Sequence, residues 1–127
     1  MTDNLLKELK QNIFYRAKIF IENLQEFAPF GAKLIEGDIK DVVYSDDAEI
    51  VDSTKGIKIL QDNFSEEIKN KIIEAGAIAF DVTANFKNGD GISEKRDALC
   101  LKISSDGENW SDEYFPYMII DGECVWK

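Results

Sequence analysis

The sequence indicates an α+β fold in which two amphipathic helices pack on one face of a mainly antiparallel sheet. In two stretches, apolar residues recur at every third or fourth position, which is typical of helices with one buried side. Elsewhere apolar and polar residues alternate, and short turns join one predicted strand to the next, which favours antiparallel pairing. A chain of 127 residues without a linker fits one α+β domain over residues 1–127. We expect the order α-β-β-α-β-β-β, with five strands, or six if the last short segment pairs.

The first helix is predicted over residues 4–27. Thr2, Asp3 or Asn4 can cap its start, and Pro29 ends it because proline disfavours helix in the preceding residue. Its apolar stripe consists of Leu5, Leu6, Leu9, Ile13, Ala17, Phe20, Ile21, Leu24 and Phe27.

A β-hairpin follows, with strands at 30–35 and 39–44 around a turn that contains Gly37. Residues 45–54 form a polar loop that is rich in acids.

The second helix is predicted over residues 55–75, with an apolar stripe at Ile57, Leu60, Phe64, Ile68 and Ile72. Gly76 suits the left-handed position just past a helix end. Asn63 and Glu66 could instead form a capping box, which leaves a break near residue 63 as the alternative.

After Gly76 the period changes to two, which predicts strands at 77–86, 96–104, 114–120 and 123–127. Pro116 cannot donate a hydrogen bond to a ladder, so its strand is expected at an edge or with a bulge. Asp121-Gly122 predicts a two-residue hairpin turn.

The composition excludes several kinds of chemistry. The chain has no histidine and carries a formal charge of −10, from 25 acidic and 15 basic residues. Histidine is the commonest general acid or base near neutral pH and the commonest metal ligand, so Ser/His/Asp and Cys/His hydrolysis and histidine-containing zinc sites are excluded. The acidic residues fall in turns and on exposed faces, which predicts that the chain is not an enzyme and has no cofactor or metal site.

Charge and cysteine content limit the partners and the location. Nucleic acids and anionic membrane surfaces are bound by basic patches, and none stands out, so neither is an expected partner. No stretch reaches the ~18 apolar residues of a membrane span, and the N-terminal residues do not resemble a signal peptide. Cys100 and Cys124 lie in apolar strands and are expected to be buried, reduced thiols of a cytoplasmic protein.

Two sets of residues form the candidate binding surface. Asp81, Thr83 and Asn85 alternate on one side of their strand, where Arg96 on the next strand could pair with Asp81 and lower its pKa. This row could bind a polar ligand or a basic side chain, or it could be a solvated sheet face. The second set consists of aromatic residues beside Pro116, which either form a hot spot or close the core. Its members are Trp110, Tyr114, Phe115 and Tyr117.

Two acidic segments, residues 45–54 and 105–113, could form a negative rim of the kind that toxin-neutralising proteins use against cationic nuclease sites. The alternative is two solvated turns.

Four short segments resemble a family of small bacterial proteins: residues 26–32 (EFAPFGA), 77–82 (AIAFDV), 97–99 (DAL) and 115–117 (FPY). In that family a helix precedes an E-F-x-P-F-G-A-like start of a hairpin, an A-x-A-x-x-D-V strand, a D-A-[IL] segment and a P-Y pair. This chain has one residue fewer before Asp81 than that strand pattern. The resemblance implies one shared compact domain, and it supplies neither an activity nor catalytic residues.

The leading expectation is therefore a non-catalytic protein-binding module, immunity- or adaptor-like, with a basic protein partner. The alternative is a small-molecule-binding domain with a pocket between sheet and helices, lined by Phe14, Phe80 and Tyr117. A homodimer formed by edge-strand pairing at residues 123–127 is a third hypothesis.

Overall fold

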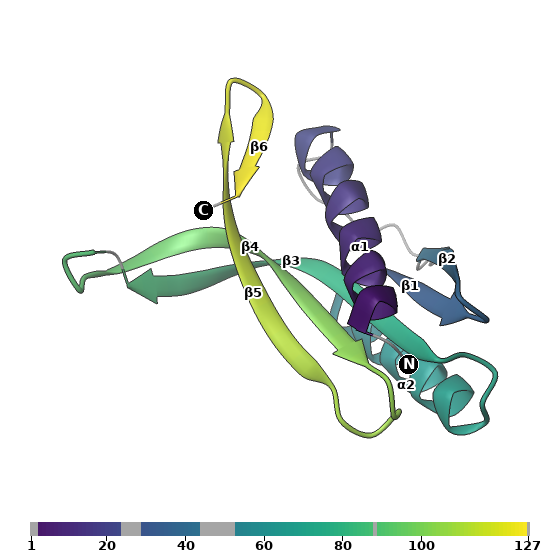
Figure 1. Ribbon diagram of the computed structural model, residues 1–127. Helices are drawn as coiled ribbons and strands as arrows, with labels where there is room; N and C mark the ends of the chain where they lie inside the picture. The colour runs from purple at the N-terminus through teal and green to yellow at the C-terminus, as the bar shows by residue number, and fades with distance from the viewer. Residues whose placement is uncertain (1–2, 24–28, 44–52, 88, 127) are drawn as a thin grey trace.

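The computed structural model describes residues 3–23, 29–43, 53–87 and 89–126. Its sheet has the strand order β2-β1-β3-β4-β5-β6, and every neighbouring pair is antiparallel (Figure 1). The predicted α+β class and element order are confirmed, with six strands. In chain order the elements are α1 (Asp3–Asn23), β1 (Phe30–Ile35), β2 (Asp38–Val43), α2 (Ser53–Lys69), β3 (Ala75–Lys87), β4 (Ser93–Ser104), β5 (Ser111–Ile120) and β6 (Glu123–Trp126).

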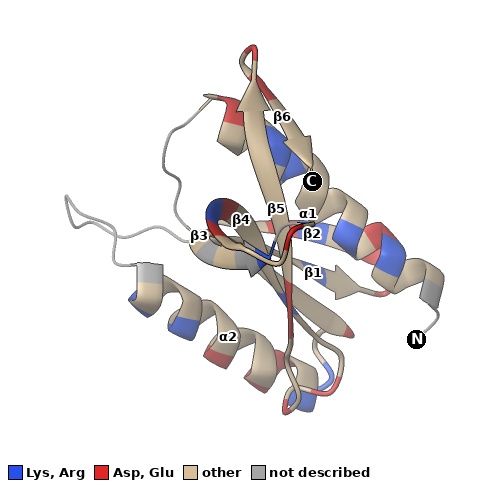
Figure 2. Cartoon of the chain, turned by 90° about the vertical axis from the view of Figure 1, so that its left-hand side faces the viewer, with Lys and Arg blue, Asp and Glu red and all other residues tan. Residues whose placement is uncertain are grey.

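The two helices lie on opposite faces of the sheet, so the prediction that both pack on one face is wrong. Ala77 and Ala79 of β3 pack in the cluster that contains Ile13 of α1, whereas Ile78 packs with Phe64 of α2. Figure 2 shows the strands between the two helices. The physical reason is that β3 is buried on both faces over residues 75–79, so each face needs its own cover.

Two glycines allow α2 to approach the sheet closely. A Cβ on Gly31 would lie 2.6 Å from the carbonyl oxygen of Ala77, and a Cβ on Gly76 would lie 2.7 Å from the ring of Phe64. The Phe64 ring therefore packs directly on the backbone of β1 and β3. Gly76 belongs to a strand, and the prediction that it terminates the helix is wrong.

The second helix is continuous through Asn63, which settles the alternative of a break there, and it ends earlier than predicted. Lys71 takes the left-handed position with φ 60°. The amides of Ile72 and Lys71 donate to the carbonyls of Glu67 and Ile68 at 2.8 and 3.0 Å, which closes the helix end. As a result Ile72, which was expected in the buried stripe, is exposed, and Ile73 is buried instead.

The other predicted turns and boundaries are close to the observed ones. Glu36-Gly37 and Asp121-Gly122 have positive φ at both central residues, as two-residue hairpin turns require. The end of the first predicted helix and most of the polar loop fall on residues 24–28 and 44–52, outside the described part of the chain.

The sheet divides into two ribbons at Pro116. Pairing between β4 and β5 runs from Ile103–Ser111 to Ala98–Pro116 and ends there. Among the described residues, β4 pairs beyond that point only with β3, and β5 pairs only with β6. We call these ribbons the β3–β4 arm (residues 83–87 and 93–97) and the β5–β6 arm (residues 117–126). They diverge in Figure 1, and we call the place where residues 95–97 and 117–119 separate the fork. β5 lies between β4 and β6, so the prediction that the strand of Pro116 lies at an edge is wrong. Pro116 itself lies at the end of the β4–β5 ladder, where its missing amide proton costs no β4–β5 hydrogen bond.

Candidate functional site

The eight residues predicted as a binding surface are divided between the two faces of the sheet. Strand alternation and the observed register decide this division. The face that carries α1 holds Asp81, Thr83, Asn85, Phe115 and Tyr117, and the opposite face holds Arg96, Trp110 and Tyr114. They cannot all contact one ligand.

The polar row centres on a hydrogen bond between two strands. The hydroxyl of Tyr117 donates to Oδ1 of Asp81 at 2.7 Å. Burial, together with the carboxylates of Asp81 and Asp97, raises the pKa of Tyr117, so the phenol stays protonated as a donor. The predicted pair of Asp81 with Arg96 is not formed. Arg96 lies opposite Ala84, on the other face, and binds Glu94 at 3.0 Å.

Most of the predicted aromatic surface belongs to the core. Phe14 of α1 packs edge-on against Phe115 and Trp126, with ring centroids 4.7 and 5.2 Å apart. Tyr117 also packs against Trp126. Trp110 packs under α2, and its Nε1 donates to the hydroxyl of Ser65 at 3.0 Å. Here the hypothesis that the rings close the core is the better one.

The predicted pocket lined by Phe14, Phe80 and Tyr117 is not formed by those residues. Phe80 packs with the α2 cluster on the opposite face, whereas Phe14 and Tyr117 pack in the α1 cluster. Two hollows lie elsewhere, between the start of α1 and the end of the β4–β5 hairpin. They share Leu6, Ile103 and Ser111 and have volumes of about 370 and 440 Å³.

The structure exposes an apolar row of which the sequence analysis predicted only Tyr114. Tyr114, Met118 and Ile120 are 50%, 45% and 43% exposed on the face of β5 that is turned away from α1. Pro116 lies between them, and Val125 of β6 pairs with Met118. We call Tyr114, Pro116, Met118 and Ile120 the β5 face. The signal was the run of residues 114–120, which is apolar on both faces, although only the α1 side is packed against a helix.

The predicted acidic rim has a different role in its described half. Asp112 pairs with Lys102 and Glu113 pairs with Lys10, each at 2.9 Å. Asp106 accepts hydrogen bonds from the backbone and side-chain amides of Asn109 and from the backbone amide of Glu108, which lowers the pKa of Asp106 and organises the turn. The other half, residues 45–54, falls largely outside the described residues.

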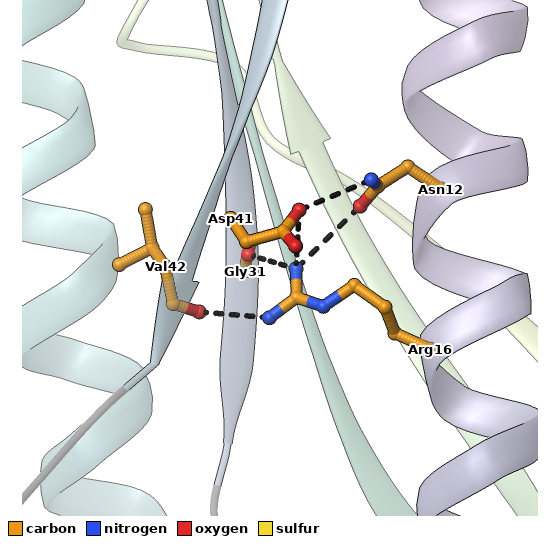
Figure 3. A network of polar contacts seen from close by, with 5 residues as sticks. All are labelled: Asn12, Arg16, Gly31, Asp41 and Val42. Carbon is orange, nitrogen blue, oxygen red and sulfur yellow. Dashed lines mark hydrogen bonds and ion pairs between the residues drawn. The ribbon is translucent and has the colours of Figure 1, made fainter.

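The most buried charge in the described part of the chain is Arg16 of α1, which is 9% exposed. Its Nη1 donates to the carbonyl of Gly31 at 2.6 Å and lies 3.4 Å from Asp41, and its Nη2 donates to Val42 at 3.4 Å (Figure 3). Asn12 donates to the same Asp41 carboxylate at 3.1 Å. Burial lowers the pKa of Arg16, and Asp41 opposes this shift. Because two of its nitrogens donate to backbone carbonyls of the hairpin and Nη1 also contacts Asn12 and Asp41, Arg16 attaches α1 to the β1–β2 hairpin.

The two cysteines lie on different strands and opposite faces, Cys100 beside Tyr114 and Cys124 in the α1 cluster. Both are free, and burial raises the pKa of both thiols, which keeps them unreactive. Among the described residues, the acidic and thiol side chains form no group of three that could hold a metal ion. Neither described helix is long and apolar enough to cross a membrane.

Comparisons with known protein families, curated proteins and solved structures found no match. The resemblance of four motifs to a small bacterial family therefore stays a prediction. What this arrangement can do chemically is to present an apolar strand face beside carboxylates.

Proposed function

We propose that this chain is a non-catalytic protein-binding module, immunity- or adaptor-like, that docks a basic protein partner on the β5 face. The exposed row of Tyr114, Met118 and Ile120 carries the proposal. A contiguous apolar patch on a small domain marks an interaction site more often than scattered apolar residues do. Tyrosine beside aliphatic side chains is also a composition that binding hot spots favour.

Charge supports a basic partner. The net charge of −10 repels acidic proteins and nucleic acids and raises the association rate of cationic ones. Asp121 and Glu123 border the β5 face at the tip of its arm. We place the chain in a bacterial cytosol, with which its two free, buried thiols are compatible.

The test compares two matched double substitutions in the chain expressed at native level. Met118→Lys with Ile120→Lys alters the β5 face, whereas Ile19→Lys with Ile72→Lys makes the same charge change at exposed apolar residues outside it. We expect the wild type and the control to capture the same basic protein. The β5-face variant should capture at least about tenfold less of it. Recovery of no basic protein, or equal loss in both variants, would overturn the proposal.

A second candidate function rests on the two adjoining hollows at Leu6, Ile103 and Ser111. A small molecule bound there at a hundredfold excess over its dissociation constant would stabilise the fold by about 2.7 kcal/mol. Thermal unfolding in the presence of metabolite classes measures this effect, and Ser111→Trp, which fills the hollows, should abolish it. A set of ligands that leaves the melting temperature unchanged rejects this candidate.

A further inference from the structure

We propose that the partner docks by adding an extended segment to the edge of β5 inside the fork, and that this segment alternates basic and apolar side chains. The inference rests on the proposed function and names the mode of binding and the chemistry of the partner. It is carried by the backbone edges of the two arms and by the different chemistry of their two faces.

The backbone geometry provides the edge. In a two-residue hairpin the residues that flank the turn, Ile120 and Glu123, form the first hydrogen-bonded pair, and the ladder then alternates. The amide and carbonyl groups of Tyr117 and Ile119 are therefore directed away from β6, towards β4 and the fork. The last β4–β5 pair, Ala98–Pro116, is a non-hydrogen-bonded pair, which the Tyr117 amide closes by donating to the carbonyl of Asp97. The open edge of β5 therefore consists of the Tyr117 carbonyl and the amide and carbonyl of Ile119. The register between β4 and β5 has already ended at Pro116, so in the described part of the chain no strand pairs with this edge. Such an edge is a template for another strand.

The face of the fork on the α1 side is acidic. Asp81 accepts the Tyr117 hydroxyl at 2.7 Å, and the exposed Asp97 accepts that of Thr83 at 3.3 Å. Asp81 and Asp97 lie on the same face of β3 and β4, and both carboxylates raise the pKa of the Tyr117 phenol. The two carboxylates are therefore close together at the point where the arms divide. Lys95 lies on this face one pleat further out on the arm. A basic side chain from an added strand would therefore meet Asp97 before Lys95, because Asp97 lies nearer to the point where the arms divide.

On the opposite face, the β5 side of the fork is apolar, whereas the β4 side carries Arg96, which is paired with Glu94. Alternate side chains of a strand added beside β5 would continue the sheet surface formed by Tyr114, Met118 and Ile120. Because successive residues of a strand point to opposite faces, one extended segment satisfies both faces only if basic and apolar residues alternate along it.

A second copy of the chain fits the fork less well. Each copy carries a charge of −10, and pairing two β5 edges brings Asp97 and the acidic tip residues Asp121 and Glu123 of both copies together. Like charges across an interface disfavour association. The partner that we propose for the fork is therefore a basic segment of another protein.

The probe is a short peptide of alternating lysine and valine with blocked ends, titrated into the full chain and followed by calorimetry. Three peptides of equal length serve as controls. One alternates glutamate and valine. The other two are the lysine–valine peptide with a methyl group on the backbone amide nitrogen of every lysine, and the same peptide with that methyl group on the backbone amide nitrogen of every valine. We expect the plain lysine–valine peptide to bind at least about tenfold more tightly than the glutamate peptide. We also expect one of the two N-methylated peptides to lose about tenfold or more, because N-methylation removes the amides that pair with β5.

Variants locate the edge. Ile119→Pro removes the amide that faces the fork without removing a bond to β6, and Ile119→Ala truncates the side chain but keeps that amide. We expect Ile119→Pro to bind the peptide at least about tenfold more weakly than Ile119→Ala. Asp97→Asn should weaken binding about two- to fivefold and reduce its salt dependence. If Ile119→Pro does not fold, the N-methylated peptides decide the question on the unaltered chain.

Equal binding by the plain and both N-methylated peptides overturns strand addition, and it leaves a side-chain interface on the β5 face standing if the capture comparison succeeds. Equal binding by the lysine and glutamate peptides overturns the basic segment. Sedimentation that finds a dimer in the wild type and a monomer in Ile119→Pro assigns the edge to a second copy and also overturns the proposal.

Discussion

Replacing Phe64 by alanine is expected to lower the free energy of unfolding by about 3–5 kcal/mol, a large part of the stability of a domain of this size. Phe64 is 1% exposed, and its ring joins α2 to the sheet. The ring lies on Gly31 and Gly76, which have no side chains that could fill the space it leaves. The cavity therefore cannot close by side-chain rearrangement alone.

Urea denaturation measures this loss. Ile59→Ala, at an exposed position on the same helix, is the matched control and should cost less than about 1 kcal/mol. A similar loss in both variants would show that the ring is not what attaches α2.

A double-mutant cycle tests the contact between the Phe64 ring and Gly76 of the sheet. Gly76→Ala places a methyl group against Phe64 and should cost about 1–3 kcal/mol. In a Phe64→Leu background the cost should be smaller, because the side chain that clashes has been shortened.

Arg16→Met is expected to destabilise the protein by about 2–3 kcal/mol, the second largest effect of a single substitution among these predictions. Methionine retains most of the apolar stem of Arg16 but cannot donate to the carbonyls of Gly31 and Val42. Hydrogen bonds from a charged donor contribute more than neutral ones, and the cost of burying the guanidinium offsets part of that gain. The acid partner Asp41 is more than half exposed, so the loss of Arg16 does not leave a buried charge behind.

Two control variants distinguish the contacts of Arg16 from ordinary ion pairs on the surface. Lys58→Met removes an exposed ion pair with Asp62, and Asp41→Asn removes only the ion pair with Arg16; each should cost less than about 1 kcal/mol in urea denaturation. If Arg16→Met is as mild as these controls, the carbonyl contacts do not stabilise the attachment of α1 to the hairpin.

Local patterns were sufficient to predict the elements. The three- and four-residue spacing of Leu9, Ile13 and Ala17, and the glycine-containing turns at Gly37 and Gly122, depend only on near neighbours in the chain. For that reason the helices, the hairpins and the order of the elements along the chain were predicted correctly. The end of α2 was misplaced because Gly76 was interpreted as a helix terminator, whereas its role is to accommodate a ring from a distant segment.

The candidate site was predicted less well, because it depends on contacts between strands. The pairing of Asp81 with Tyr117 rather than Arg96 follows from a register that places Arg96 opposite Ala84. The aromatic run around Pro116 did not reveal that Phe115 and Tyr117 point inward while Tyr114 and Met118 point outward and stay exposed.

The sequence by itself determined the α+β class, the order of the elements, the acidic charge and the absence of histidine chemistry, because these follow from composition and from spacings within one segment. Only the tertiary structure decided which face each helix covers, that Arg16 is buried, and that the strands part at Pro116. Those features depend on which residues of distant segments meet. A shift of one residue in strand pairing turns every side chain to the other face, and the periodicity of a single strand does not specify its partner.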